Sequence, residues 1–413
     1  MKLTKILLMF FLLIAIIAGC SDSSTSPGNS SQQVNGAVTS ENGVPLTGVT
    51  VQIENQTVIT TADGKFTVPN VKAPFNVKLL KTEGGISKGV EYVGLRNFSP
   101  VLTMDLVPSD AFLSTIQLNL PFSLGANQNA IVVFTDNANV FSMSNIISGQ
   151  SAGNLVSIWK GSSSISGKIY VLVYTKFATN ITSYDNYGEI DFTINSGSTQ
   201  TKTITLAEIN TNPPELEVSG SIMQPTGFSN VASQLSLKAS GGFLSGIPLS
   251  SVSNGVAFSY LVPGGLGNDL QLSLIAVATG SSGKQSTADL VVQPGSTNIQ
   301  INLVNGSDLN TPANNSSGID TNNIFTFTPV SGAGTYKALF SSGTRKFTVY
   351  SSSTSITIPN FAPFGVEIGN NQNYTWSVSS VNASIDALVS KRMDDNSNVT
   401  RLENSDTWFF TTN

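Results

Sequence analysis

Two serine motifs in the chain have the spacing of known serine nucleophiles. Residues 149–153 read Gly-Gln-Ser-Ala-Gly, the pattern in which a strand-turn-helix elbow presents a serine to a histidine base. The chain contains no histidine, which excludes Ser-His-Asp and Cys-His catalysis and imidazole zinc sites. Ser157 and Lys160 have the Ser-x-x-Lys spacing, but they lie in a strand-like run in which their side chains face opposite ways. Neither motif therefore predicts an enzyme.

Acidic side chains gather in two polar segments, and carboxylate oxygens are ligands that Ca²⁺ prefers. Segment 184–191 holds the candidate calcium ligands Asp185, Glu189 and Asp191, and 394–398 is a second acidic loop. Neither segment has the twelve-residue spacing of an EF-hand, so we favour solvated turns and expect no metal or other cofactor. A hydrolase with two carboxylates on distant strands stays open as an alternative, because such a site leaves no local motif.

Aromatic side chains offer another kind of site, since sugars stack on exposed aromatic faces. The candidate glycan-binding residues are Trp159, Tyr184 and Tyr187. The competing interpretation is that aromatic residues along strands are divided between the core and ordinary surface. We favour that interpretation for each residue and keep a glycan platform as the alternative.

The first twenty residues have the order of a secretory signal peptide. Lys2 and Lys5 precede an uncharged apolar run, 6–17, which is shorter than a membrane-spanning helix. Residues 17–20, Ile-Ala-Gly-Cys, resemble the lipobox of bacterial lipoprotein precursors. The resemblance implies cleavage before Cys20 and acylation of its sulfur and new amine, which anchors a protein firmly to a membrane. An ordinary cleaved signal with a chance cysteine is the alternative.

The surroundings of Cys20 agree with lipidation. It is the only cysteine among 413 residues, so it has no disulfide partner within the chain. The segment 20–33 is rich in Ser, Thr, Pro, Gly and Asn and predicts a flexible tether. Ser21, where the lipoprotein resemblance would place aspartate for inner-membrane retention, favours the outer membrane. We therefore expect the signal peptide 1–19 to be removed and the mature chain to face the periplasm or the cell surface.

Composition limits the partners of the folded part. Charged residues make up 11% of the chain, against about 25% in an ordinary soluble protein. The net charge is −5 and no basic run occurs, so nucleic acid is not an expected partner. Hydrophobic residues reach 40%, which is enough for packed cores.

Apolar residues alternate with a period of two in short runs bounded by Gly, Asn, Asp, Pro and Ser, which predicts an all-β chain of tandem sandwiches. Helical turns are expected only at 143–148 and 384–389. Residues 34–108 form the expected first domain. Its Gly-x-Val start, the turn 45–49 and the Thr-x-Asp-Gly-x-Phe hairpin 61–66 resemble the carboxypeptidase regulatory-like family. The resemblance implies a transthyretin-like sandwich, grouped with carbohydrate-binding-like folds, with an accessory role.

Three further parts follow. Residues 111–211 and 214–304 each place an Asp before four mostly apolar strand residues and a Gly-Ser-Thr hairpin, so we interpret them as diverged sandwich repeats hinged at 212–214. Chance likeness between strand-rich segments is the alternative. The polar segment 305–323 is the expected linker.

The remaining residues, 324–413, resemble a fibronectin type III or related Ig-like domain. The matching segments are Phe-Thr-Phe-Thr-Pro at 325–329, Tyr-Thr-Trp-Ser-Val at 374–378 and the ending 405–412. This resemblance implies a spacer or binding module. The sequence thus predicts a non-catalytic cell-surface lipoprotein that acts as a multidomain spacer, adhesion or interaction module for polysaccharide or surface proteins. An accessory carbohydrate-binding lipoprotein is the alternative, and a histidine-free carboxylate hydrolase is the distant alternative.

Overall fold

The computed structural model describes residues 31–106, 111–138, 140–240, 246–280, 283–392 and 399–413. Within these ranges nearly all regular structure is strand, with two 3-10 helices and the short α-helix α2 (Ile385–Leu388). The all-β prediction is confirmed. The signal peptide and Cys20 lie outside the described residues. In the part of the chain that the structure describes, no helix has the length and apolarity to cross a membrane.

The strands fall into four sandwiches. Sandwich 1 consists of β1 (Gln32–Ser40), β2 (Thr50–Ile53), β3 (Gln56–Ile59), β4 (Lys65–Val71), β5 (Phe75–Glu83), β6 (Ile86–Leu95) and β7 (Val101–Met104). Sandwich 2 consists of β8 (Phe112–Asn119), β9 (Gln128–Thr135), β10 (Phe141–Ile146), β11 (Ala152–Trp159), β12 (Ser164–Phe177), β13 (Asn180–Asn195) and β14 (Thr199–Thr203). Sandwich 3 consists of β15 (Glu215–Met223), β16 (Phe228–Ala239), β17 (Ile247–Ser253), β18 (Ala257–Pro263), β19 (Leu270–Gly280), β20 (Gln285–Val292) and β21 (Ile299–Asn302).

These three sandwiches have the same seven-strand topology. One sheet has the order fourth–first–seventh strand, with the first and seventh parallel, as in β4-β1-β7, β11-β8-β14 and β18-β15-β21. The other sheet has the order third–second–fifth–sixth, as in β3-β2-β5-β6, β10-β9-β12-β13 and β17-β16-β19-β20. Sandwiches 2 and 3 therefore repeat one another in topology, and sandwich 1 shares their arrangement.

Sandwich 4 is built differently. It contains β22 (Leu309–Thr311), β23 (Ser316–Ile319), β24 (Phe325–Phe327), β25 (Thr335–Ser341), β26 (Arg345–Ser351), β27 (Ser355–Ile356), β28 (Asn373–Val381), β29 (Arg401–Asn404) and β30 (Trp408–Thr412). Its smaller sheet is β22-β24-β27, and its larger sheet joins β26, β25 and β28 to β29 and β30. An aromatic core of Phe325, Phe340, Trp376 and Phe410 fills the space between the sheets.

The expected linker 305–323 is wrong as a structural description, because it contains β22 and β23. β22 pairs with β24, and β23 runs parallel to β30. Leu309 and Ile319 are buried in the core of sandwich 4. Burial of these two apolar side chains, together with backbone pairing to the sandwich, holds this polar segment in strands.

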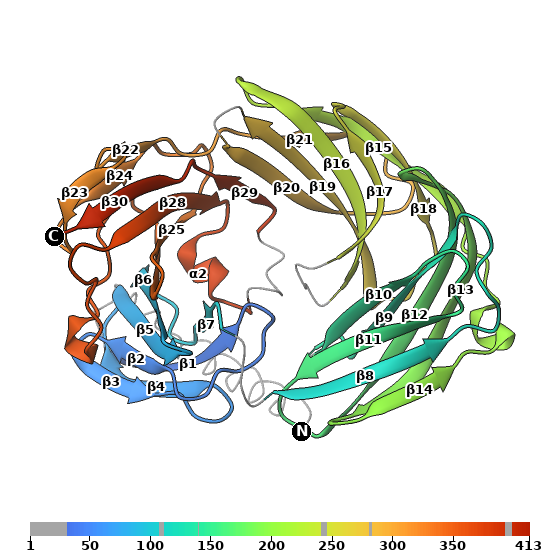
Figure 1. Cartoon of the computed structure of the whole chain (residues 1–413), viewed down its shortest axis with the longest axis horizontal. Helices are drawn as coiled ribbons and strands as arrows, with labels where there is room; N and C mark the ends of the chain where they lie inside the picture. The colour runs from blue at the N-terminus through green and yellow to red at the C-terminus, as the bar shows by residue number, and fades with distance from the viewer. Residues whose placement is uncertain (1–30, 107–110, 139, 241–245, 281–282, 393–398) are drawn as a thin grey trace, which may run out of the picture.

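The sandwiches form a ring (Figure 1). The four-stranded sheets of sandwiches 3 and 1 join the larger sheet of sandwich 4 into one continuous sheet, through β20–β29 pairing on one side and parallel β26–β6 pairing on the other. Sandwich 2 packs against sandwich 3, and Lys160 returns to sandwich 1 through hydrogen bonds to Thr47 Oγ1 at 2.7 Å and the Pro45 carbonyl at 3.2 Å. The chain is therefore not an extended string of domains.

Sandwich 2 shows why a continuous apolar run forms a central strand here. In β9, Ala130, Val132 and Phe134 point into the core of sandwich 2. The alternate residues Ile131 and Val133 belong to the cluster shared with sandwich 3. Successive side chains of a strand point to opposite faces, so a strand covered on both faces needs apolar residues at every position.

Three local expectations have different outcomes. Residues 143–148, expected as a helical turn, are largely in β10, which pairs with β9. The turn expected at 384–389 is confirmed as α2, in which the Ser384 hydroxyl accepts a hydrogen bond from the Ala387 amide at 3.3 Å. The expected hinge at 212–214 is held on both sides, because Tyr187 pairs with Thr211 and the Pro214 carbonyl accepts a bond from Gly264.

Candidate functional site

The structure places the three candidate glycan-binding residues in the interior. Trp159 is buried in the core of sandwich 2, where its indole donates a hydrogen bond to the Ser162 carbonyl at 2.7 Å. Tyr184 and Tyr187 are only 2% and 4% exposed. A sugar stacks on an accessible ring face, so these buried rings do not form the glycan platform that was kept as the alternative, and their burial agrees with the favoured core interpretation.

The two tyrosines instead join sandwich 2 to sandwich 3. The Tyr184 hydroxyl donates to the Leu261 carbonyl at 2.9 Å, and the Tyr187 hydroxyl accepts from the Gly267 amide at 2.8 Å and donates to Glu189 at 2.9 Å. Burial is the main cause that raises the pKa of both hydroxyls above the ordinary value. Aromatic residues with a polar tip suit such an interface, because the ring is buried and the hydroxyl keeps a partner.

Two of the three candidate calcium ligands, Asp185 and Glu189, have protein partners, and Asp191 is exposed. Asp185 accepts hydrogen bonds from Gln128, Thr175 and Ser183 at 2.8–2.9 Å. Glu189 pairs with Lys168 at 3.1 Å. Within the described residues, no group of three or more His, Cys, Asp or Glu side chains is arranged to hold a metal ion. The acidic loop 394–398 lies outside the described residues.

The serine motifs are not assembled into reactive sites. Ser157 is buried in β11 and its hydroxyl is 2.7 Å from that of Ser142. Lys160 points to sandwich 1 instead of towards Ser157. Residues 149–153 form a turn that leads into β11, so the helix of a nucleophile elbow is replaced by a strand.

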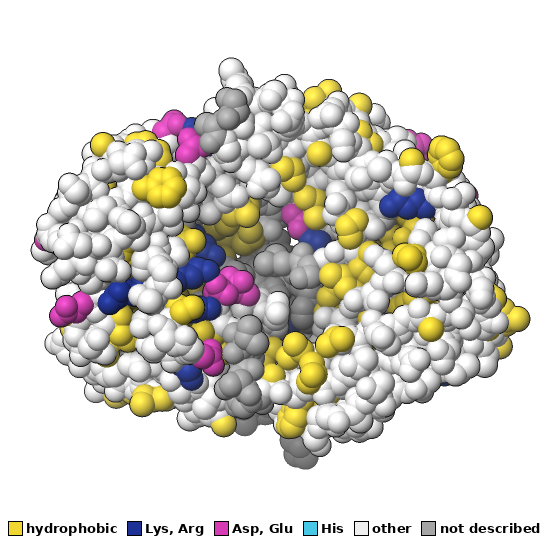
Figure 2. All heavy atoms as spheres, viewed as in Figure 1, with side chains coloured by type: hydrophobic (Ala, Val, Ile, Leu, Met, Phe, Trp, Pro, Cys, Tyr) yellow, Lys and Arg dark blue, Asp and Glu magenta, His cyan; other side chains and the backbone are white. Residues whose placement is uncertain are grey.

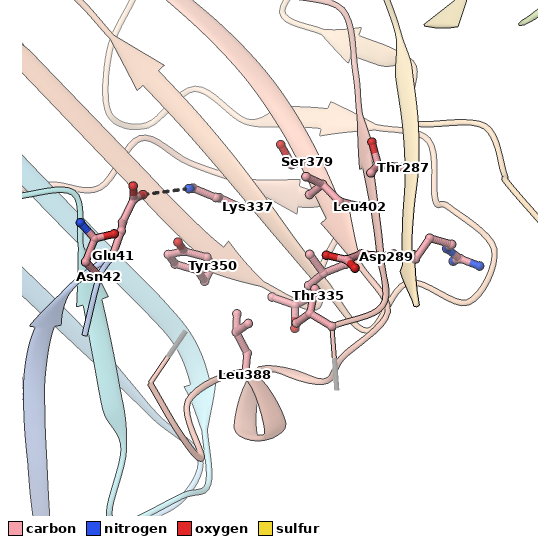
Figure 3. A pocket seen from close by; sticks show the side chains of 13 residues that line it. Glu41, Asn42, Thr287, Asp289, Thr335, Lys337, Tyr350, Ser379, Leu388 and Leu402 are labelled. Carbon is pink, nitrogen blue, oxygen red and sulfur yellow. Dashed lines mark ion pairs between the residues drawn. The ribbon is translucent and has the colours of Figure 1, made fainter. Parts of the chain in front are cut away.

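A pocket of about 510 Å³ lies where sandwiches 1, 3 and 4 meet, and we call it the central pocket (Figure 3). It is lined by Glu41, Asn42, Thr287, Asp289, Thr335, Lys337, Tyr350, Ser379, Val381, Leu388, Val399, Arg401 and Leu402. In the space-filling view, acidic and basic side chains gather beside a hollow near the middle of this face (Figure 2). A volume of this size is typical of small-molecule sites.

The floor of the central pocket is one face of the continuous sheet. Thr335 of β25, Val381 of β28, Leu402 of β29 and Thr287 of β20 are paired in register, strand by strand. Residues an odd number of positions away along the same strand point the other way, as Val378 and Ala338 do into the core of sandwich 4. Strand pairing between sandwiches 3 and 4 thus builds a floor that neither sandwich has alone.

Apolar surface is left uncovered on this floor. Val381, Leu402 and Val399 are half-buried, whereas the core side chains of sandwich 4 are almost fully buried. Leu388 of α2 also lines the pocket, beside the strands of the floor (Figure 3). Apolar area that the described residues do not cover favours a ligand with an apolar body.

Two of the four charged side chains around the central pocket are neutralised by partners in the protein. Asp289 accepts from Lys238 and from the Ser273 hydroxyl. Arg401 forms an ion pair with Glu403 and donates to the Ser331 carbonyl at 2.5 Å. These contacts fix Asp289 and Arg401 at the junction of sandwiches 3 and 4.

The other two charges are Lys337 and Glu41, and they contact each other loosely. The Lys337 ammonium lies 4.0 Å from Glu41 Oε1 and 5.8 Å from the centroid of the Tyr350 ring. Their side chains are 35% and 52% exposed. Figure 3 shows Glu41 and Asn42 reaching the pocket from sandwich 1, opposite the strands of sandwich 4.

Sequence reasoning missed the central pocket, because its residues come from three sandwiches and carry no local motif. One signal was present. In β25, Lys337 stands between the buried residues Tyr336 and Ala338, and in β28 Ser379 and Val381 alternate with core residues. Such alternation indicates that one face of the strand points away from the core of its own sandwich. It does not indicate that another domain lies over that face.

No protein-family model matches the chain. No curated protein matches it either. The TIE protein of Bacillus anthracis is 12% identical over 66% of this chain, with a TM-score of 0.16, and this chain spans 50% of its length. A leucine-rich repeat protein of Bacteroides thetaiotaomicron is 16% identical over 47% of this chain and 27% of that chain, with a TM-score of 0.17. A Ca²⁺-stabilized adhesin with which an Antarctic bacterium binds ice is 10% identical over 92% of this chain and 99% of that chain, with a TM-score of 0.17. These low scores carry no argument about fold or function.

Proposed function

We propose that the chain is a non-catalytic interaction protein, held at the cell surface by a lipid on Cys20, whose ring of sandwiches presents the central pocket to a small ligand. The observation that carries this proposal is the origin of the pocket: its lining comes from sandwiches 1, 3 and 4. Strand pairing fixes both junctions, β20 to β29 and β26 to β6. A preformed, partly apolar pocket with few polar groups is typical of binding sites.

Residues 17–20 and the tether after them support the proposed membrane attachment. Acyl chains on Cys20 would hold the folded ring outside the cytoplasm. Labelling of growing cells with an alkynyl fatty acid tests this, and Cys20→Ser is the matched control. We expect label on the wild-type chain and none on the variant. Label that survives Cys20→Ser would contradict lipidation at this residue.

Binding in the central pocket is tested by thermal unfolding of the mature chain, residues 20–413 with Cys20→Ser, against a panel of small molecules. A ligand that binds the folded state raises the midpoint as its concentration rises above Kd. Val381→Trp places a large side chain on the pocket floor and is expected to remove the shift. A shift that is equal in this variant, or no shift with any compound, contradicts the proposal.

A further inference from the structure

We infer that the central pocket takes an amphipathic anion, a molecule with a compact apolar body and one carboxylate or sulfonate that binds Lys337. This inference rests on the proposed function and names the ligand class for the same pocket. The four charged side chains around the pocket differ in whether the protein already pairs them. Asp289 and Arg401 already have close partners in the protein.

Of the two cationic side chains among the described residues that line the pocket, Lys337 is the one available to a ligand. It lies on the central strand β25, between Tyr350 of β26 and Ser379 of β28. Among the described residues, no carboxylate comes nearer to its ammonium than Glu41 Oε1 at 4.0 Å. A lysine ammonium has three donors, and a charge-assisted hydrogen bond to an anion is stronger than a neutral one.

Glu41 occupies the side of Lys337 from which an anion would approach. It stands in the turn between β1 and the isolated bridge at Pro45, and its side chain is half exposed. A contact of 4.0 Å with exposed partners is a weak surface ion pair. The anion of a ligand would therefore replace Glu41 beside Lys337, and the Glu41 charge would oppose that binding.

The apolar body would lie against Val381, Leu402 and Val399. Their half-buried side chains and Leu388 line the pocket. Figure 3 shows Leu402 on the side away from Glu41. Tyr350 is not a stacking platform for a sugar, because it is 4% exposed and its ring is stacked on Tyr92. The pocket thus offers an apolar floor and a cation at one end, which is complementary to an amphipathic anion.

Two fluorescent probes separate the anion from the apolar body. 1-Anilinonaphthalene-8-sulfonate carries a sulfonate, and N-phenyl-1-naphthylamine has nearly the same aromatic body without charge. We expect both to bind the mature Cys20→Ser chain with one site each. Val381→Trp and Leu402→Trp, on neighbouring strands, should remove both signals. Thermal unfolding of each variant shows whether it folds. If one of the two tryptophan variants does not fold, the result of the other decides the test.

The charge variants have opposite expected signs. Lys337→Gln should weaken sulfonate binding about tenfold, because one charge-assisted hydrogen bond is lost. The affinity for the neutral probe should change about twofold at most. Glu41→Gln should tighten sulfonate binding by about twofold or more, because it removes a like charge. Lys65→Gln, at an exposed lysine of sandwich 1, is the control and should change neither probe.

Decanoate, an apolar chain with one carboxylate, tests whether a carboxylate can take the place of the sulfonate. It should displace the sulfonate probe from wild type more strongly than from Lys337→Gln. If Lys337→Gln leaves the affinity for the sulfonate probe unchanged, or lowers the affinity for both probes equally, the proposed ligand class is wrong. The proposed pocket function is not affected by that result. If neither probe binds wild type, or both stay bound in the two filled variants, the proposed pocket function fails as well.

Discussion

The ring of Tyr350 stacks on the ring of Tyr92, with centroids 4.6 Å apart and planes 6° from parallel. Tyr350 belongs to β26 of sandwich 4, and Tyr92 belongs to β6 of sandwich 1. The two strands pair in parallel, and these residues are directly opposite in the register. The stacked pair therefore joins two sandwiches and also forms the base beneath Lys337 in the central pocket.

Removal of this pair should loosen the junction. Tyr350→Ala deletes a buried aromatic ring and leaves a cavity, so we expect a loss of about 3–5 kcal/mol in the free energy of unfolding. Urea unfolding followed by tryptophan fluorescence measures the loss. Tyr350→Phe keeps the stacked ring and should cost less than about 1 kcal/mol. An equal cost for both variants would show that the hydroxyl, not the ring, stabilises the junction.

The Tyr184 hydroxyl should stabilise the interface between sandwich 2 and sandwich 3. It donates to the Leu261 carbonyl, and Tyr184→Phe leaves that part-buried acceptor without this partner, at a cost of about 0.5–1.5 kcal/mol. Tyr174→Phe makes the same chemical change in a buried ring of the same cluster, where no described residue bonds the hydroxyl, and should cost less. Calorimetric unfolding of both variants checks the order, and the reverse order would contradict this role for Tyr184.

The sequence predicts the features of this architecture that depend on residues close together in the chain, and it does not predict those that depend on distant residues. Period-two alternation predicts the strands, and Asp63-Gly64 predicts a tight turn that is present, with Gly64 at φ 74°. The predicted hairpin is wrong, because β3 before the turn pairs with β2, and β4 after it pairs with β1 in the other sheet. A turn sequence specifies local backbone angles, but it does not specify which sheet the next strand enters.

The same limit applies to the Gly-Ser-Thr turns near 197 and 295. They were predicted to return as hairpins, but β14 and β21 cross to the opposite sheet and run parallel to β8 and β15. Tyr184 and Tyr187 show the limit for sites. Their alternation is compatible with a solvent-exposed face, and only the packing of sandwich 3 on that face makes it an interface. The central pocket was unpredictable for the same reason.

Glu403 should make stability depend on pH. Its side chain is fully buried, and burial raises its pKa above 4.5 despite the Ser380 hydrogen bond at 2.6 Å and the Arg401 ion pair. A raised pKa means that the folded state holds the proton more tightly than the unfolded state. The contribution is present below pH 4.5 and is lost as pH rises through the folded pKa. Glu403→Gln should remove this slope in chemical unfolding across pH 4–7. An unchanged slope would assign the pH dependence to other groups.

Lys160 should control how tightly the ring closes. Its bonds to Thr47 and Pro45 link sandwich 2 to sandwich 1. Lys160→Met should lower stability by less than about 1 kcal/mol, because the contact is one partly exposed side chain. It should nevertheless broaden the distance between spin labels at Thr57→Cys and Thr201→Cys in the Cys20→Ser chain. Lys176→Met is the control, and an unbroadened distribution in Lys160→Met would show that other contacts close the ring.

Gly89 should be essential to the pairing of sandwiches 1 and 4. It lies in β6 opposite Phe347 of β26, and a Cβ at this position would stand 2.3 Å from the Phe361 ring. Gly89→Ala forces that ring away and should cost about 1–3 kcal/mol, as overpacking does in other cores. Gly343→Ala is the matched control, since a Cβ there meets no described atom within 4 Å. Urea unfolding measures both. If the cost comes from the ring, Phe361→Leu should lower it in the double variant, whereas additive costs would contradict the contact.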